Sequence, residues 1–245
     1  MRARRRFAGA QLLRAFADCH PDALFVEIGA NNGEAYDHLA PYVRSRNWRG
    51  VMVEPVPFLF ERLRENYGDL ERVVLENVAI ADRDGRLPFY APRPDAASDQ
   101  DLPAWYPAIG SFSREVVLRL AREIPDLEQR IERIEVPCMT FESLCGKHGI
   151  DELDLLVIDT EGYDWEIVRN LDLEARRPRL LVYEHYHLTD GQQADARAHL
   201  ASFGYETMEE FFDTFCLDTR VEDGLTQAWR ELRPRVPAVS IHRER

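Results

Sequence analysis

Several features that define common classes of protein are absent from this chain of 245 residues. No apolar run approaches the roughly 20 residues that a membrane-spanning helix needs. The basic start, Met1-Arg-Ala-Arg-Arg-Arg, is not followed by the apolar stretch of a secretory signal. The four cysteines form no CxxC pair, which favours reduced and mostly buried thiols. These absences predict a cytoplasmic protein without a membrane span.

Positive charge is also scarce. Lys147 is the only lysine, and 31 basic residues against 44 acidic ones give a formal net charge of -13. A protein that grips phosphate backbones needs a basic surface, so we expect no nucleic-acid partner. With 45% apolar and 10% aromatic residues, the chain has too many core-forming side chains to be disordered. Its length suits one domain over residues 1–245, with a core at about 22–220.

Apolar runs of strand length alternate with stretches of helical period. We predict strands at residues 24–28, 50–54, 73–79, 153–158 and 179–184. We predict helices between them at residues 11–17, 35–43, 57–67, 164–171 and 192–203. The strands are apolar almost throughout, as in a parallel sheet that helices cover on both faces. The pattern predicts a Rossmann-like, doubly wound α/β fold.

Two segments depart from this alternation. Residues 205–212 and 213–218 read as two strands joined by a very short turn, which forces them to run antiparallel at the edge of the sheet. Residues 91–135 form a long insertion that contains Trp105, Tyr106, Ile109 and Phe112, and these apolar side chains favour a lid that packs on another surface. Residues 221–245 are predicted to be a C-terminal extension with a short helix and a charged tail.

The first predicted strand leads into the turn Val26-Glu-Ile-Gly-Ala-Asn-Asn-Gly33. Glycines at such a turn let the backbone approach a ligand closely, and a following helix offers unpaired N–H groups. A dinucleotide fingerprint would also place glycine at positions 31 and 34, which hold Asn31 and Glu34. The turn therefore favours a nucleoside without a pyrophosphate, bound around Gly29, Ala30, Asn31 and Gly33.

The next two strand ends carry candidate contacts for the nucleoside. Glu54 lies roughly 20 residues beyond the glycine turn, where a carboxylate can accept both hydrogen bonds of a ribose diol. Pro55 and Val56 would form an apolar shelf for a purine. The segment that contains Asn77 and Ala79 could contact the purine edge through its backbone and amide groups.

Two further carboxylates are expected beside this pocket. Glu27 and Asp159 lie at the ends of adjacent central strands, at the crevice where open α/β sheets bind ligands. Uncompensated carboxylates favour a cationic ligand. A nucleoside that carries an amino acid and a positive sulfonium, S-adenosylmethionine, matches these features.

Several strings together resemble one family. They occur in the order seen in FkbM-type methyltransferases: Val26-Glu-Ile-Gly-Ala-Asn-Asn-Gly33, Val53-Glu-Pro55, Asn77-Val-Ala-Ile-Ala-Asp-Arg-Asp-Gly85, Val136-Pro-Cys-Met-Thr140, Leu156-Val-Ile-Asp-Thr-Glu-Gly162 and Pro178-Arg-Leu-Leu-Val-Tyr-Glu184. The resemblance implies the seven-stranded class I methyltransferase sheet. It also implies an S-adenosylmethionine-dependent O-methyltransferase (EC 2.1.1), which leaves S-adenosylhomocysteine as product. The implied acceptor is a hydroxyl of a small molecule such as a sugar, a polyketide or another natural product.

Two departures from the family pattern limit what can be transferred. Asn32 and Glu34 stand where relatives often have small or apolar residues. The insertion at 91–135 carries only a faint likeness, around Gly110-Ser111. We therefore expect the insertion to determine which acceptor is bound.

An aliphatic hydroxyl is a weak acid, so methyl transfer to it needs a base or a metal ion. Candidate groups follow the fourth and fifth strands: Asp159, Glu161, Glu184, His185 and His187. If the chain stays extended, His185 and His187 share one side and Glu184 lies on the other. Our first hypothesis takes His185 or His187 as the base, with Asp159 orienting cofactor or acceptor. In the rival hypothesis, Asp159, Glu184 and His185 hold a divalent cation that acidifies the hydroxyl.

Other functions and assemblies remain open at this point. A nicotinamide-dependent oxidoreductase would need a glycine at position 34, which is absent. A non-catalytic nucleoside-binding module on the same fold is the main alternative that is not an enzyme. The insertion and the arginine-rich tail could each serve the interface of a homodimer.

Overall fold

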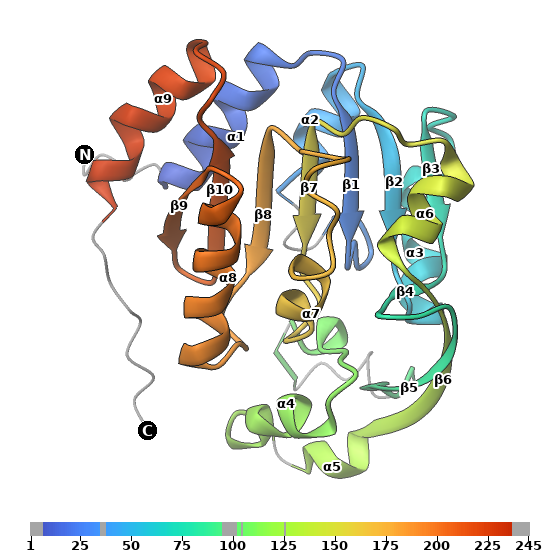
Figure 1. Ribbon diagram of the computed structural model, residues 1–245. Coiled ribbons are helices and arrows are strands. Elements are labelled where there is room, and N and C mark those ends of the chain that lie inside the picture. The colour runs from blue at the N-terminus through green and yellow to red at the C-terminus, as the bar shows by residue number, and fades with distance from the viewer. Residues whose placement is uncertain (1–6, 35–37, 95–101, 104, 125, 237–245) are drawn as a thin grey trace, which may run out of the picture.

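The computed structural model describes residues 7–34, 38–94, 102–103, 105–124 and 126–236 (Figure 1). Its main sheet has seven strands in the order β3-β2-β1-β7-β8-β10-β9. The strands are β1 (Leu24–Ile28), β2 (Arg49–Val53), β3 (Val73–Glu76), β7 (Leu155–Ile158), β8 (Leu180–Glu184), β9 (Tyr205–Glu210) and β10 (Asp213–Asp218). The strands from β3 to β8 pair in parallel, whereas β10 pairs antiparallel with both β8 and β9. The predicted fold class, including the antiparallel C-terminal hairpin, is confirmed.

Helices cover both faces of this sheet because neighbouring strand residues point to opposite sides. One buried cluster contains Phe25 and Leu155 and packs against residues of α1 (Ala8–Cys19), α2 (Ala40–Ser45), α3 (Pro57–Tyr67) and α9 (Gly224–Leu232). The other contains Val26 and Leu156 and packs against α6 (Phe141–His148), α7 (Asp164–Val168) and α8 (Asp190–Ser202). The apolar strands are therefore buried on both sides, as their sequence predicted.

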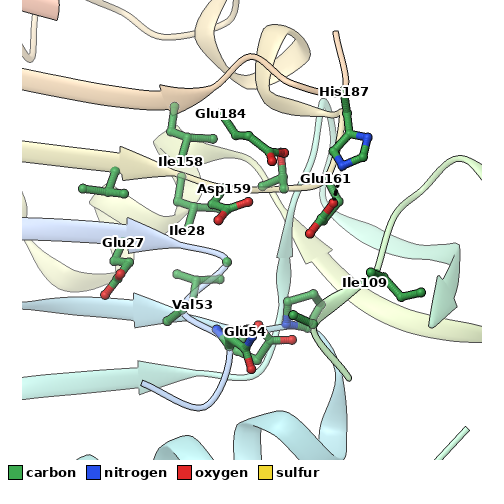
Figure 2. A pocket seen from close by; sticks show the side chains of 18 of the residues that line it. Glu27, Ile28, Val53, Glu54, Ile109, Ile158, Asp159, Glu161, Glu184 and His187 are labelled. Carbon is green, nitrogen blue, oxygen red and sulfur yellow. Dashed lines mark hydrogen bonds and ion pairs between the residues drawn. The ribbon is translucent and has the colours of Figure 1, made fainter. Parts of the chain in front are cut away.

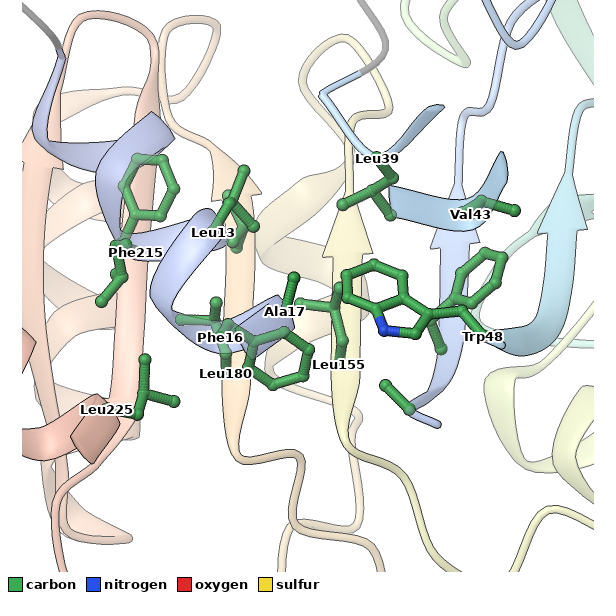
Figure 3. Close-up of a cluster of buried hydrophobic side chains, with 14 of the residues drawn as sticks. Leu13, Phe16, Ala17, Leu39, Val43, Trp48, Leu155, Leu180, Phe215 and Leu225 are labelled. Atoms are coloured by element: carbon green, nitrogen blue, oxygen red, sulfur yellow. The ribbon is translucent and has the colours of Figure 1, made fainter. Parts of the chain in front are cut away.

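Aromatic side chains of α1 and of the segment before β2 anchor the first cluster (Figure 3). Phe16 and Trp48 are fully buried, and their rings meet edge to face at 5.6 Å. The Trp48 indole N–H donates to the backbone oxygen of His20 at 2.8 Å, so its one polar atom is satisfied. Burial of an aromatic side chain of this kind contributes about 2–3 kcal/mol. This packing holds α1 against the sheet.

A second sheet of three strands, in the order β4-β6-β5, was not predicted. It consists of β4 (Ala79–Ile80), β5 (Gly85–Pro92) and β6 (Ile131–Met139). The prediction of a single strand at 73–79 is wrong: the chain bends at Asn77, whose amide group donates to the backbone oxygens of Glu54 and Pro55. The insertion is also longer than 91–135, because its two ends are the long antiparallel strands β5 and β6.

The rest of the insertion lies beyond the carboxyl ends of the parallel strands (Figure 1, green). It contains the 3-10 helices η2 (Tyr106–Ala108) and η3 (Arg119–Arg122) and the short helices α4 (Arg114–Leu118) and α5 (Leu127–Arg130). It has a small apolar cluster of its own around Tyr106 and Ile124. The insertion therefore lies at the edge of the main sheet where the parallel strands end.

The observed bounds of helices and strands differ most from the predicted ones where the sequence pattern is weak. The helix predicted at 35–43 is α2, which begins only at Ala40 with Pro41 in its first turn. Residues 35–37 and the tail at 237–245 lie outside the described residues. The chain closes with α9 and the 3-10 helix η4 (Arg233–Arg235). Among the helices that the structure describes, none is both long and apolar enough to span a membrane.

Candidate active site

A cavity of about 440 Å³ lies at the carboxyl ends of β1, β2, β7 and β8 (Figure 2). Trp105, Ile109 and Phe112 of the insertion and Phe212 of the β9–β10 hairpin add apolar walls. The volume is in the range of small-molecule sites. Open α/β sheets bind their ligands at this edge. Its size and position therefore mark the cavity as the candidate active site.

Acidic side chains dominate the wall of this cavity. The described residues that line it include two histidines and seven carboxylates but no lysine or arginine: His38, His187, Glu27, Glu54, Glu123, Asp159, Glu161, Glu184 and Asp213. A cleft lined with charge of one sign concentrates ligands of the opposite sign. The cavity is therefore suited to a ligand that carries positive charge.

The turn after β1 ties the central strands together at the cavity edge. Gly29 has a φ of 87°, and a Cβ at this position would lie 1.7 Å from the backbone oxygen of Asp159. Only glycine fits such a close approach. The N–H groups of Gly29 and Ala30 both donate to the backbone oxygen of Val53 at 2.9 Å. Asn31 follows with a φ of 52°, a conformation that asparagine tolerates.

Glu54 follows β2 and is only 4% exposed. Its carboxylate accepts hydrogen bonds from the N–H groups of Asn31 at 2.9 Å and Val56 at 2.8 Å. Burial raises the pKa of Glu54 to about 7, against the opposing effect of these two donors. Pro55 and Val56 line the cavity beside it. The carboxylate of Glu54 thus lies in the cavity wall, as expected of a group predicted to accept hydrogen bonds from a ribose.

Asp159 follows β7 in a loop that the buried carboxylate of Asp164 holds in place. Burial raises the pKa of Asp159 well above its usual range, and repulsion from Glu161 and Asp164 raises it further. Asp164 is fully buried and accepts from the N–H groups of Thr160 at 3.4 Å and Gly162 at 3.2 Å. Burial raises the pKa of Asp164 to about 7. Asp164 therefore shapes the loop that carries Glu161.

Glu161 and His187 form a pair, with 2.8 Å between Glu161 Oε2 and His187 Nε2. Glu161 has a φ of 51°, which is unusual for a residue with a long side chain. The hydroxyl of Ser111 in the insertion donates to the backbone oxygen of Glu161 at 2.8 Å. Arg119 donates to the backbone oxygen of His187 at 3.4 Å. The insertion thus contacts the backbone of both members of the pair.

The condition under which His185 and His187 would share one side, a chain that stays extended after Glu184, is not met. β8 ends at Glu184, and the chain then turns. His185 Nδ1 lies 2.9 Å from the hydroxyl of Thr214 on β10, and His185 does not line the cavity. Glu184 and His187 are the residues that point into it (Figure 2). The prediction depended on an extended chain through His185 and His187, but the extended strand ends at Glu184.

The predicted cation ligands Asp159, Glu184 and His185 are not brought together, because His185 faces away from the cavity. Instead, a carboxylate oxygen of Glu161, one of Glu184 and a ring nitrogen of His187 lie within 4.8 Å of one another. One carboxylate oxygen of Glu184 is buried without a hydrogen-bond partner. Glu161, Glu184 and His187 therefore form one cluster in the cavity wall at the ends of β7 and β8.

Comparison with known families gives a match over most of the chain. Residues 27–207 match the family described as the methyltransferase FkbM domain. The chain belongs to this family.

Two curated relatives of this FkbM-family chain are O-methyltransferases by name. The 2-O-methyltransferase NoeI of Sinorhizobium fredii (strain NBRC 101917 / NGR234) is 26% identical over 181 residues, which are 70% of this chain and 68% of NoeI. The 31-O-demethyl-FK506 methyltransferase FkbM of Streptomyces tacrolimicus is 27% identical over 215 residues, 81% of this chain and 78% of the relative. A solved FkbM methyltransferase from Methylobacillus flagellatus KT has a TM-score of 0.49 at 13% identity, over 80% of this chain and 44% of that one.

In this FkbM-family methyltransferase, most of the predicted cofactor residues line the cavity: Glu27, Gly29, Ala30, Asn31, Glu54, Pro55, Val56, Ala79 and Asp159. Gly33 and Asn77 do not. Gly33 has a φ of 72° and packs where a Cβ would meet the ring of Tyr67. The amide group of Asn77 bonds to the backbone after β2. Both residues therefore shape the turns around the cavity and do not lie in its wall.

Three residues of the site escaped the sequence-based selection. Ser111 and Asp164 act through backbone contacts to the loop around Glu161. Asp213 was assigned only to a strand, yet it lines the cavity, and burial raises its pKa to about 6. The Ser111 contact spans 50 residues. Only Asp164 carried a local signal, as an acidic residue at the start of a helix.

Proposed function

We propose that this protein is an S-adenosylmethionine-dependent O-methyltransferase that acts on a hydroxyl of a small molecule. The proposal depends mainly on one observation: two groups of residues, one suited to a nucleoside and one suited to removing a proton, line the same cavity. One group consists of Glu54 and the turn at Gly29, and the other is the Glu161–His187 pair. The family and the names of the two curated relatives support O-methylation. Four unpaired thiols support a reducing, cytoplasmic location.

The residues present fit this cofactor. The carboxylate-lined wall without lysine or arginine suits the positive charges of the sulfonium and ammonium groups. Glu54 would hold the ribose, since each carboxylate oxygen can accept a further hydrogen bond beyond the one from the backbone. Pro55, Val56 and Ala79 would enclose the adenine, and Glu27 and Asp159 would face the amino-acid part.

The chemistry then needs alignment and removal of one proton. S-adenosylmethionine supplies a methyl group that its sulfonium activates for in-line displacement. The Glu161–His187 pair takes the proton of the acceptor hydroxyl as a unit, because its two members share a hydrogen bond. Ser111 and Arg119 hold the backbone of the pair in place. The aromatic walls from the insertion exclude water and orient the acceptor.

Calorimetric titration of the purified protein, freed of bound ligand, tests the proposal directly. We expect micromolar binding of S-adenosylhomocysteine and none of NADH. Glu54→Ala should abolish the binding, whereas Glu174→Gln, which changes an exposed carboxylate outside the cavity wall, should leave it unchanged. Circular dichroism spectra of both variants should match that of the parent protein, as a control for folding. Absence of S-adenosylhomocysteine binding by the folded protein would refute the proposal. Binding without methyl transfer to any hydroxyl would favour a non-catalytic binding module.

A further inference from the structure

Three exposed phenylalanines, which we call the aromatic patch, lie together beside the cavity. Phe211 and Phe212 form the two-residue turn between β9 and β10, and they are 53% and 50% exposed. Phe7 precedes α1, is 55% exposed, and meets the ring of Phe211 edge to face at 4.9 Å. Single exposed apolar residues are common, but a contiguous group of them marks an interaction surface.

The backbone at two of these positions favours a different residue. Phe211 has a φ of 56°, which glycine adopts freely but a bulky side chain does not. Phe7 is the N-cap of α1, where serine, aspartate or asparagine would bond to the helix through the side chain. Residues that go against local preference are expected at functional sites. Folding therefore does not account for these two rings, whereas binding does.

The aromatic patch has a rigid support. The carboxylate of Glu210 accepts from the N–H groups of Ala8 and Gly9 at 2.8 and 2.7 Å, which joins the hairpin to α1. The N–H of His185 donates to the backbone oxygen of Phe212 at 2.8 Å, which joins the hairpin to the end of β8. Because the turn is already fixed, its rings lose little conformational entropy when they bind a surface.

Positive charge directly precedes the aromatic patch in the sequence. Residues 1–6, Met-Arg-Ala-Arg-Arg-Arg, contain four arginines and lie outside the described residues. Six residues extend at most about 20 Å, so the arginines stay near Phe7. The proposed function does not use this basic segment.

The acidic side chains nearest the turn are engaged elsewhere. Glu209 pairs with Arg197 at 2.5 Å, Glu210 bonds to the start of α1, and Asp213 lines the cavity. Exposed charges farther away than a Debye length, about 10 Å at 0.1 M salt, are largely screened. The net charge of -13 for the whole chain therefore does not set the charge that a partner meets at the aromatic patch.

An anionic bilayer matches both features. Aromatic rings enter the boundary between headgroups and acyl chains, arginines attract acidic lipids, and attachment is stable when two such signals act together. We propose that the aromatic patch and residues 1–6 dock this protein on an anionic membrane surface. Because Phe212 also lines the cavity, docking places the cavity beside the lipid headgroups. Docking needs neither cofactor nor acceptor, so the inference goes beyond the proposed function.

Flotation of the whole chain with lipid vesicles tests the inference directly. Vesicles of phosphatidylcholine with about 30% phosphatidylglycerol are compared with vesicles of phosphatidylcholine alone. We expect at least about tenfold stronger binding to the anionic vesicles. Binding should fall in about 0.5 M NaCl, because salt screens the arginines.

Two substitutions remove rings from positions that favour another residue. Phe7→Ser supplies a preferred N-cap, and Phe211→Gly suits the positive φ, so the double variant should melt at or above the parent temperature. Its binding to anionic vesicles should fall at least about tenfold. Val221→Ser is the matched control, because Val221 is 50% exposed but follows the opposite end of β10. This control should bind as the parent protein does.

A third variant tests the contribution of charge. Replacement of Arg4, Arg5 and Arg6 by glutamine should weaken binding to anionic vesicles at least about tenfold. It should leave the weaker binding to phosphatidylcholine unchanged, because that lipid carries no net charge.

Several outcomes would overturn the inference. These are no binding of the parent protein to anionic vesicles, equal binding to both kinds of vesicle, unchanged binding by the double variant or the arginine variant, and a lower melting temperature of the double variant. A parent protein that sediments as a dimer, with the double variant as a monomer, would instead make the aromatic patch an interface between two copies. Failure to bind S-adenosylhomocysteine refutes only the proposed function, so the two failures are distinguishable.

Discussion

At the scale of single residues, Gly29 is the position where the site tolerates least change. Its positive φ and the backbone oxygen of Asp159, 1.7 Å from where a Cβ would lie, both forbid a side chain. We expect Gly29→Ala to lower the unfolding free energy by at least about 2 kcal/mol and to abolish S-adenosylhomocysteine binding. Thermal melting and calorimetry measure the two effects.

The matched control for this substitution is Gly146, which lies within α6 and has open space where a Cβ would lie. Gly146→Ala should stabilise the protein by about 0.5–1 kcal/mol, because alanine favours a helix more than glycine does. Equal effects of the two substitutions would contradict the view that close approach of Gly29 to Asp159 builds the site.

Glu54 gives a second prediction, from its pKa. Burial raises this pKa from 4.5 to about 7, so the folded protein keeps a proton that the unfolded chain has lost. The native state is therefore penalised progressively as the pH rises from 4.5 to about 7. At about 1.4 kcal/mol per pH unit, the penalty reaches about 3 kcal/mol.

Urea unfolding at about pH 5 and about pH 7.5 measures this effect. The parent protein should lose more stability than Glu54→Gln between the two values, by up to about 3 kcal/mol. Using the variant as reference cancels the contributions of all other titrating groups. Identical losses in the two proteins would show that Glu54 titrates normally.

At the scale of elements, the insertion lines the cavity and also contacts the backbone of the Glu161–His187 pair. Ser111 pairs with Tyr90 of β5 through the backbone, and its hydroxyl donates to the backbone oxygen of Glu161. The ring of Phe112 packs against Tyr163 at 4.7 Å. The unusual backbone conformation of Glu161 is thus held by an element that is distant in sequence.

We predict that Ser111→Ala lowers kcat about tenfold, the equivalent of one lost hydrogen bond of about 1.4 kcal/mol, and leaves the affinity for S-adenosylhomocysteine unchanged. Ser113→Ala is the control, because Ser113 caps α4 through the N–H of Val116 and makes no hydrogen bond to Glu161. Steady-state kinetics should separate the two variants. A similar loss of kcat in both would mean that the insertion acts only through its general stability.

At the scale of the whole molecule, the acidic character of the protein favours the positively charged form of the proposed cofactor over the neutral form. The chain carries a net charge of -13, and seven of its carboxylates line the described cavity wall, where there is no lysine or arginine. S-adenosylmethionine has a positive sulfonium where S-adenosylhomocysteine has a neutral sulfur. The protein should therefore bind the substrate form more tightly than the product form, which favours product release.

Calorimetry of both compounds at low salt and at about 0.5 M NaCl tests this prediction. The preference for S-adenosylmethionine should shrink at high salt and also at about pH 5, where the buried carboxylates are protonated more fully. Glu174→Gln, an exposed change of the same charge, should leave the preference intact. Equal affinities at low salt would show that the carboxylates do not serve the sulfonium.

The sequence alone determined the elements whose signals are local. A continuous apolar run placed β1 at its observed bounds, and a stretch of helical period did so for α3. The short connection after residue 210 required the antiparallel hairpin. The sequence also showed that Gly29 directly follows one predicted strand and that Glu54 lies at the end of the next. Their convergence in one cavity followed from the parallel topology, because parallel strands bring their carboxyl ends to the same edge.

Only the tertiary structure decided which side chains meet beyond the ends of β7 and β8. His185 turns to Thr214 and His187 to Glu161 because the chain leaves β8 at Glu184, and those partners lie on other elements. The second sheet likewise depends on pairing between β5 and β6, roughly 40 residues apart. Side-chain direction after a strand end is set by such distant contacts, which no local periodicity records.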